Sequence, residues 1–259
     1  MSSVLFTQIG HVARRSVVRT LRQPAQIVPS LVFPMMLLAI NASGLQRVTK
    51  IPGFPTNSFV TFALAIPFMQ GALFSVMNAG TDLARDIETG FLNRLALTPL
   101  RGAALLIGLL AGALVLGVVQ AICFLLVGLA AGASFAAGMP GVLVLVALSM
   151  LITLGFGAIG LVAALRTGSG EAVQGLFPLL FVFLFLSSMN LPRNLIQTDW
   201  FRHVATYNPV SYLIEGIRSL LVTGWDGEAL ALGFGIAAAI AVLGMVAASA
   251  ALKTRLVRT

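Results

Sequence analysis

Five stretches of the chain carry no aspartate, glutamate, lysine or arginine, and their lengths limit the folds that the chain can adopt. They contain 24, 31, 64, 21 and 24 residues, at positions 23–46, 51–81, 102–165, 172–192 and 229–252. An α-helix needs about 20 apolar residues to cross a bilayer core of about 30 Å. Four stretches therefore predict one spanning helix each, and the longest predicts two, separated by a hinge at 132–140. The six predicted spans cover about 25–45, 58–79, 103–131, 139–165, 172–191 and 229–252.

The composition excludes several classes of protein. Hydrophobic residues make up 58% of the 259 residues and charged residues only 9%, whereas roughly a quarter are charged in a soluble domain. Such a chain is neither soluble and globular nor disordered or fibrous. A single cysteine, Cys123, excludes a disulfide scaffold and a cysteine metal cluster. The net charge is +8, and the basic residues lie between the apolar stretches. This placement indicates contact with a membrane surface rather than with a nucleic acid. We predict an all-α polytopic membrane protein with a single domain over residues 1–259.

The distribution of basic residues predicts the topology. With six spans both chain ends lie on one side of the membrane, and that side carries eleven of the sixteen lysines and arginines. Because cytoplasmic loops carry the excess of positive charge, we expect both termini in the cytoplasm. Arginine outnumbers lysine fourteen to two, which hints at a GC-rich bacterium, and the expected location is the bacterial cell membrane.

Residues 4–23 predict an amphipathic helix. Apolar side chains recur on a broad face from Leu5 to Leu21, polar and basic ones lie opposite, and Pro24 ends the helix before the first span. The helix is either a cap on the bundle or an interfacial helix whose arginines face anionic lipid in the headgroup layer. We favour the interfacial helix, because a short arginine-bearing helix joined to a span has few other places to lie.

The longest loop on the side of the termini covers residues 80–101 and mixes acidic, basic and apolar side chains, with Gly90 between two short helical pieces. The mixture fits a solvated loop with weak ion pairs, and it fits equally a ridge that docks into a groove on a soluble partner. In the second case Phe91, Leu92 and Leu95 would fill the groove and the flanking charges would set the register. The residues of interest are Asp82, Arg85, Asp86, Glu88, Gly90, Phe91, Leu92, Arg94, Leu95, Thr98 and Pro99.

On the opposite side, residues 192–228 contain every tryptophan and tyrosine of the chain, and these aromatic residues favour the membrane interface. Asn208-Pro209 marks the start of a helix that is too short to span the membrane and suits a re-entrant helix. Glu215 and Arg218 lie three residues apart, so we expect them to pair. The segment is either an ordinary loop helix or an outer gate. The gate residues would be Asn208, Pro209, Tyr212, Glu215 and Arg218.

The usual catalytic patterns are missing from the sequence. It contains no G-x-x-x-x-G-K-[ST] P-loop, so the chain does not hydrolyse ATP by that route. His11 and His203 fall on opposite sides of the membrane, and Cys123 is expected to act as a small hydrophobe. No carboxylate falls clearly within a span, which weakens the case for a proton- or sodium-coupled carrier. We predict no enzyme activity, no metal site and no cofactor for the chain itself.

Glycines and large apolar side chains indicate how the spans pack. Gly108 and Gly112 lie four residues apart, a spacing that lets helix backbones approach closely. Several bulky residues could line an adaptable apolar path, although such residues more often face lipid or core. They are Met35, Phe68, Met69, Phe177 and Phe181.

Two segments resemble a known family. Residues 84–99, ARDIETGFLNRLALTP, resemble the cytoplasmic loop of ABC-type-2 exporter permeases, in which a charged stretch and a glycine precede a leucine ridge ending in Thr-Pro. Residues 208–221, NPVSYLIEGIRSLL, resemble the motif before the last span of the same family. The branch with the strongest likeness is that of the daunorubicin-resistance and nodulation-factor exporter permeases. The chain departs from the family pattern at Phe91 and Asn93, where threonine and glutamate are common.

The resemblance implies the permease subunit of an ATP-driven exporter. Such a subunit would move an amphipathic or hydrophobic compound, namely a drug, a lipid or a lipid-linked glycan, out of the cytoplasm or the inner leaflet. The first segment would be a coupling helix that docks on a separate ATPase subunit, which binds ATP and Mg, and the second would be an outer re-entrant hairpin. Two permease chains, identical or different, would combine with two ATPase chains. The alternatives are a stand-alone carrier or channel and a structural assembly protein, and an ATPase gene next to this one would favour the exporter.

Overall fold

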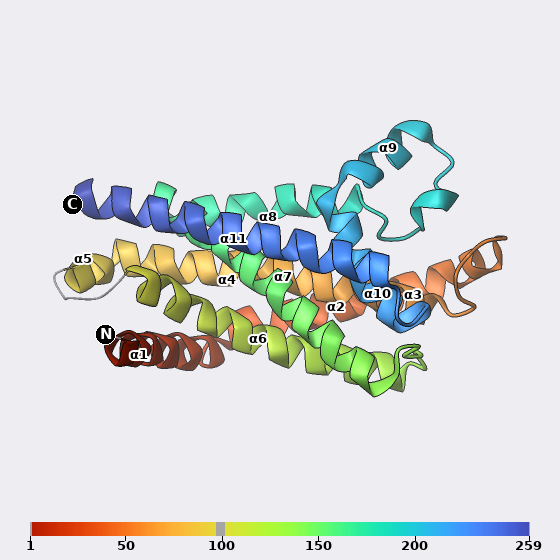
Figure 1. Cartoon of the computed structure of the whole chain (residues 1–259), viewed down its shortest axis with the longest axis horizontal. Coiled ribbons are helices and arrows are strands. Elements are labelled where there is room, and N and C mark those ends of the chain that lie inside the picture. Colours follow the sequence, from red (N-terminus) through yellow and green to blue (C-terminus); the bar gives the residue numbers. More distant parts are fainter. Residues whose placement is uncertain (1, 97–101, 259) are drawn as a thin grey trace.

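The computed structural model describes residues 2–96 and 102–258, and every regular element within these ranges is a helix. The long helices form an elongated bundle (Figure 1). Both chain ends and α5 lie at one end of it, the terminal end, whereas η1 and α9 lie at the opposite, distal end (Figure 1). The elements are α1 (Ser2–Leu21), α2 (Pro24–Leu45), η1 (Gln46–Lys50), α3 (Phe59–Ala63), α4 (Ala65–Glu88), α5 (Phe91–Ala96), α6 (Gly102–Ala130), α7 (Gly138–Thr167), α8 (Gly170–Phe185), η2 (Arg193–Leu195), α9 (Asp199–Tyr207), α10 (Pro209–Val222) and α11 (Gly227–Arg258).

Five helical segments are long and apolar enough to cross a membrane, and they match five of the six predicted spans. The hinge predicted at 132–140 is also present, because α6 ends at Ala130 and α7 begins at Gly138. The five segments are Pro24–Lys50, Phe59–Glu88, Gly102–Ala130, Gly138–Thr167 and Gly227–Leu256.

The remaining predicted span, 172–191, is shorter than expected. α8 contains 16 residues and ends at Phe185, which gives a length of about 24 Å. The side-chain amide of Asn208 fixes this end, because it donates hydrogen bonds to the carbonyls of Phe183 and Leu186 at 2.6 and 3.0 Å. The uncharged stretch continues past the helix end, so the length of that stretch overestimates the helix.

The second predicted span ends later than expected. It was predicted to stop at residue 79, but α4 continues to Glu88, so residues 80–88 are helical. Asp82 and Asp86 in these last turns are buried against other helices. The charges end the apolar stretch without ending the helix, because the tertiary contacts described below compensate them.

α4 lies at the centre of the bundle. In its most apolar window 89% of the residues are buried, compared with 17% for α2 and 22% for α11 at the periphery. Its contact with α7 depends on a glycine, since a Cβ atom at Gly160 would collide with the carbonyl oxygen of Val76. A central helix that reaches both ends of the bundle can connect them mechanically.

α1 packs along α6 with one face and leaves the other face exposed. Ser16 and Thr20 are buried in the contact, and the hydroxyl of Ser16 donates a hydrogen bond to the carbonyl of Leu109 at 2.8 Å. Gly112 makes room for this approach, because a Cβ atom there would lie 2.6 Å from Ser16 Oγ. The helix therefore lies along α6, and its opposite face is exposed.

Candidate functional site

At the distal end, Asn208 joins two helices. Its Oδ1 accepts the N–H of Val210 at 3.0 Å, which caps α10, while Pro209 takes the first helical position, where its missing N–H costs nothing. The helix start expected at Asn208-Pro209 is confirmed, and the Asn208 side chain also holds the end of α8. Ten of the 14 residues of α10 are buried. This helix is therefore inserted into the bundle and does not lie on its surface.

Glu215 pairs with Arg193 of η2 and not with Arg218, so the predicted Glu215–Arg218 pair is wrong. The two guanidinium–carboxylate distances are 2.9 and 2.6 Å, and the Arg193 guanidinium also lies 4.4 Å from the centre of the Tyr212 ring. Burial by itself lowers the pKa of Arg193, but the charge of Glu215 and its hydrogen bonds more than offset this, so the pKa is raised. Arg193 therefore remains charged, and it fastens the outer loop to α10.

Arg218 points into the bundle instead, where it is only 6% exposed. Its guanidinium donates to the carbonyls of Phe62, Ser188 and Met189 at 3.2, 2.9 and 2.7 Å, and it lies 3.7 Å from the centre of the Phe62 ring. The first carbonyl lies beside the break between α3 and α4. One cation thus ties three separate segments together, and no carboxylate among the described residues forms an ion pair with it.

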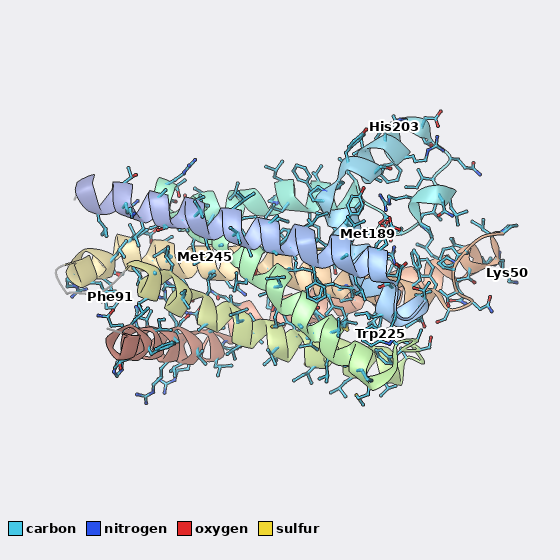
Figure 2. The ribbon with its side chains drawn as sticks, viewed as in Figure 1. Lys50, Phe91, Met189, His203, Trp225 and Met245 are labelled. Atoms are coloured by element: carbon cyan, nitrogen blue, oxygen red, sulfur yellow. The ribbon has the colours of Figure 1, made fainter. Side chains whose placement is uncertain are left out.

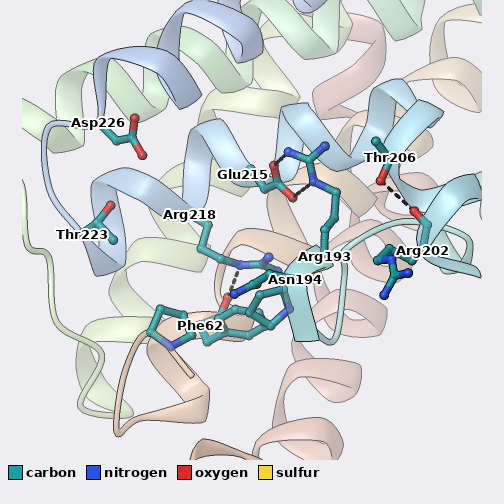
Figure 3. A pocket seen from close by; sticks show the side chains of 11 residues that line it. Phe62, Arg193, Asn194, Arg202, Thr206, Glu215, Arg218, Thr223 and Asp226 are labelled. Atoms are coloured by element: carbon teal, nitrogen blue, oxygen red, sulfur yellow. Dashed lines mark hydrogen bonds and ion pairs between the residues drawn. The ribbon is translucent and has the colours of Figure 1, made fainter. Parts of the chain in front are cut away.

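A cavity of about 570 Å³ opens beside these groups (Figure 3). Figure 3 shows the Glu215–Arg193 pair on one side of it, with Arg218 and Phe62 on another. Arg202, at the rim, forms an exposed ion pair with Asp199. The lining residues are Pro55, Phe62, Pro192, Arg193, Asn194, Arg202, Thr206, Glu215, Arg218, Thr223 and Asp226.

At the terminal end, two arginines of α1 meet two carboxylates of α4. The guanidinium of Arg15 forms a bidentate ion pair with the carboxylate of Asp86, with N–O distances of 2.8 and 2.7 Å. The guanidinium of Arg19 pairs with Asp86 at 2.9 Å and with Asp82 at 3.1 Å. The hydrogen bond to Asp86 raises the pKa of Arg15, so its charge is secure. We call these four residues the terminal ion cluster. Asp82 and Asp86, which were expected to face a soluble partner, instead bind within the chain.

α5 follows directly, and its apolar side chains are less available than expected. Leu92 is only 1% exposed and Leu95 packs against the same apolar cluster. The guanidinium of Arg15 lies 3.8 Å from the centre of the Phe91 ring, which Figure 2 shows at the terminal end. The predicted ridge therefore turns inward at Leu92. The exposed charges of this region are Arg85, Glu88 and Arg94.

Two further residues of the predicted loop, Thr98 and Pro99, lie outside the described residues. Gly90, as expected, separates the two helical pieces, with a φ of +69° that other residues rarely adopt. Glu88 accepts the N–H of Gly170 at 3.2 Å and so contacts the start of α8.

The sequence model of a family described as ABC-2 type transporter matches residues 7–222. The chain belongs to this family. Because the match covers both ends of the bundle, the two sites described above are parts of one ABC-2 transporter domain.

Curated relatives agree with this assignment. The chain is 29% identical over 200 residues to the daunorubicin resistance ABC transporter permease protein DrrB1 of Streptomyces coeruleorubidus, covering 73% of this chain and 69% of the relative. It is 26% identical over 226 residues to a protein named as a transport permease, ycf38, of Porphyra purpurea, covering 86% of this chain and 77% of the relative. The resemblance to the daunorubicin-resistance branch is thereby confirmed.

This ABC-2 permease is the membrane-spanning, transporting subunit of an ABC transporter. A permease of this family is not itself the catalytic component, and it works with an ATPase subunit. The five membrane-spanning segments agree with a multi-pass membrane protein.

The five residues predicted to line a path all belong to or pack against one apolar cluster of this permease. Phe177 and Phe181 of α8 have ring centres 4.7 Å apart, and they form a five-ring cluster with Phe33, Phe74 and Phe185. By contrast, Phe68 packs against Phe124 within the core, at 5.6 Å between ring centres. Met69 is also buried in the core, whereas Met35 is half-buried at its edge.

Several functional contacts were missed by sequence reasoning. The sequence did not reveal that Glu215 pairs with Arg193, or that the α4 carboxylates pair with Arg15 and Arg19. In each pair the two residues lie far apart in the chain. Phe33 and Phe74 were missed because phenylalanines are common in apolar spans and carry no distinguishing pattern. The sequence contains one indication of the contact between α1 and α4, namely that Arg15 and Arg19 lie on the polar face of the first helix.

Proposed function

We propose that this permease exports an amphipathic or hydrophobic compound, such as a drug, a lipid or a lipid-linked glycan, from the cytoplasm or inner leaflet. The energy would come from a separate ATPase subunit that binds ATP and Mg. The observation that carries the proposal is the reach of the segment Phe59–Glu88. It contacts Arg218 through Phe62 at the distal end and the two α1 arginines through Asp82 and Asp86 at the terminal end.

In this mechanism the ATPase acts on the terminal end. Arg85, Glu88 and Arg94 are exposed beside α5 and can set the orientation of a soluble partner. Movement of α5 would be passed to α1 through Phe91 and Arg15, and to α4 through the terminal ion cluster. A rigid displacement of α3 and α4 would then disturb the carbonyl contacts of Arg218 and open the distal end.

The cargo would be amphipathic or hydrophobic, since the five-ring cluster between α2, α4 and α8 offers an apolar surface. The name of the DrrB1 relative makes daunorubicin the natural first probe. Inside-out vesicles that contain the permease and its ATPase should accumulate daunorubicin only with hydrolysable ATP. A matched preparation with Asp86→Asn should hydrolyse ATP but accumulate less.

The alternative functions give different results in the same vesicles. A stand-alone carrier or channel would move daunorubicin or a fluorescent phospholipid without ATP. A structural protein would move neither under any condition. Either result would overturn the exporter proposal.

The proposed orientation places both termini in the cytoplasm of a bacterial cell. It is supported by the common position of the chain ends and by the eleven-to-five division of basic residues. Single cysteines at Ser3, Lys50, Ala136 and Arg258, in a Cys123→Ala background, can be labelled from outside with an impermeant thiol reagent. Positions 50 and 136 should react, and labelling at 258 would refute the orientation.

The proposed assembly contains two permease chains and two ATPase chains. Six helices of the bundle would form half of the membrane part, as in the family that the chain resembles. Native mass spectrometry of the purified complex measures the composition directly. A transport-competent complex with a single permease chain would refute the proposal.

A further inference from the structure

The exposed side of α1 carries a cleft that the proposed function does not use. The cleft has a volume of about 500 Å³, and no acidic side chain of the described chain lines it. It lies opposite the buried face that holds Ser16 and Thr20, as expected from the 100° spacing of successive residues in a helix. Its lining residues are His11, Arg14, Arg15, Val18, Arg19 and Arg22.

The charges of the cleft are only partly neutralised. Arg15 and Arg19 share the two carboxylates Asp82 and Asp86. Neither Arg14 nor Arg22 has an acidic partner among the residues that the structure describes, and both are exposed. Four guanidinium groups against two carboxylates leave an excess of positive charge on this side of the helix.

An exposed apolar side chain lies at the end of this strip next to α2. Leu21 is 51% exposed there. Beyond Leu21, α2 carries exposed apolar residues every fourth position, which places them in one stripe along the bundle: Val28, Val32, Met36 and Ile40. The basic strip therefore begins where a surface suited to acyl chains ends.

We propose that this cleft binds the phosphate headgroup of an anionic phospholipid in the leaflet at the terminal end. Guanidinium groups suit phosphate because they present paired N–H donors at matching spacing. The acyl chains would follow the apolar stripe of α2, which begins seven residues after Leu21 at Val28. An acidic protein surface would also satisfy the arginines, but α1 ends at Leu21 and leads directly into the spanning segment that begins at Pro24, so the cleft lies where the headgroup layer meets the apolar core and a lipid fits better.

A headgroup in this cleft would lie close to the coupling machinery. Arg15 lines the cleft, pairs with Asp86 and covers the ring of Phe91. Lipid occupancy would therefore affect the position of α5, a second step that rests on the proposed function. The binding step concerns the permease alone and is tested without the ATPase.

The test uses the intact purified permease in detergent, with phosphatidylglycerol or phosphatidylcholine added, and native mass spectrometry to count retained lipids. Arg14→Gln with Arg22→Gln should weaken phosphatidylglycerol retention on the order of tenfold. Arg47→Gln with Lys50→Gln removes the same charge at the distal end, where Figure 2 shows Lys50, and should leave retention unchanged. Thermal melting of both variants without lipid checks that the fold is retained.

Three results would overturn the proposal. Equal retention of phosphatidylglycerol by both double variants would show that the cleft is not the site. Displacement of the lipid by millimolar inorganic phosphate would show that the cleft takes a free anion. Unchanged lipid retention, combined with loss of the ATPase on co-purification of the Arg14→Gln, Arg22→Gln variant, would make the strip a protein-docking surface.

Discussion

The two ends of the bundle use arginine in opposite ways. At the distal end a single buried guanidinium, that of Arg218, is satisfied by three carbonyls. At the terminal end Arg15 and Arg19 face the carboxylates Asp82 and Asp86, and Arg15 remains partly exposed. A buried cation held by fixed carbonyls is costly to release, whereas a partly solvated ion cluster can separate and reform. The distal contacts therefore resist separation and, in the proposed mechanism, yield only when α3 and α4 are displaced, whereas the contacts of the terminal ion cluster separate more easily.

The largest effect should come from removing the distal cation. Arg218→Met leaves the carbonyls of Phe62, Ser188 and Met189 without their donor, which should lower stability by about 3 kcal/mol or more. Thermal melting of the detergent-solubilised permease measures the loss. Arg202→Met removes an arginine from the exposed rim and should cost less than about 1 kcal/mol. Equal melting temperatures for the two variants would contradict the comparison.

Arg218→Lys sharpens the same test if the methionine variant fails to fold. Lysine keeps the charge, but its ammonium group lacks the planar set of N–H donors with which the guanidinium binds three carbonyls. We expect a melting temperature between those of the wild type and Arg218→Met. A lysine variant as stable as the wild type would show that charge alone matters.

Breaking the terminal ion cluster should have a smaller effect on stability and a larger one on coupling. Asp86→Asn weakens the contacts of both Arg15 and Arg19, and we expect a cost of about 2 kcal/mol. Transport per ATP hydrolysed should fall severalfold in proteoliposomes. Asp199→Asn, which breaks an exposed pair at the other end, should leave the ratio unchanged. An intact ratio in Asp86→Asn would mean that the cluster only fastens α1.

The Glu215–Arg193 pair should contribute about 1 kcal/mol, measured as the coupling energy of a double-mutant cycle with Glu215→Gln and Arg193→Gln. Exchanging the charges, Glu215→Arg with Arg193→Glu, should recover part of the transport that either single change loses. The exchange Glu215→Arg with Arg218→Glu should recover none, because Arg218 is needed at its carbonyls. Recovery by the second exchange would restore the pairing expected from sequence spacing.

The smallest effect on stability should follow from removing single rings from the aromatic cluster on α8. Phe177→Ala and Phe181→Ala each remove a ring that is half-buried between helices, at a cost of about 1 kcal/mol. Daunorubicin export should fall severalfold while ATP hydrolysis by the complex continues. Phe183→Ala, on the lipid-exposed side of α8, serves as the control. An equal loss in all three variants would place the pathway elsewhere.

The arrangement of spans could be predicted from the sequence because bilayer thickness imposes a length on every uncharged stretch. The prediction failed where a helix outlasts its apolar stretch, as α4 does to Glu88, or ends before it, as α8 does at Phe185. Both deviations depend on side chains elsewhere in the chain: the arginines of α1 hold the end of α4, and Asn208 holds the end of α8.

The site was predicted less completely than the fold. The cap at Asn208 involves only the next two residues, Pro209 and Val210, so the local sequence was enough to predict where α10 begins. The partner of Glu215 lies 22 residues away, and Arg218 binds main-chain carbonyls, which leave no trace in the side-chain pattern. Leu92 was expected outside because charges flank it, but its burial depends on how α5 folds back over the bundle.

The shortness of α8 has a consequence for the surrounding bilayer. About 24 Å of helix stands against a hydrocarbon core of about 30 Å, and its exposed Leu179, Val182, Phe183 and Phe185 leave this wall in contact with acyl chains. Such hydrophobic mismatch is relieved when the membrane thins locally or the helix is left short of one interface. Either response brings headgroups and water deeper beside α8 than elsewhere on the perimeter. A lipid-like molecule that leaves along this wall would have a shorter apolar distance to travel.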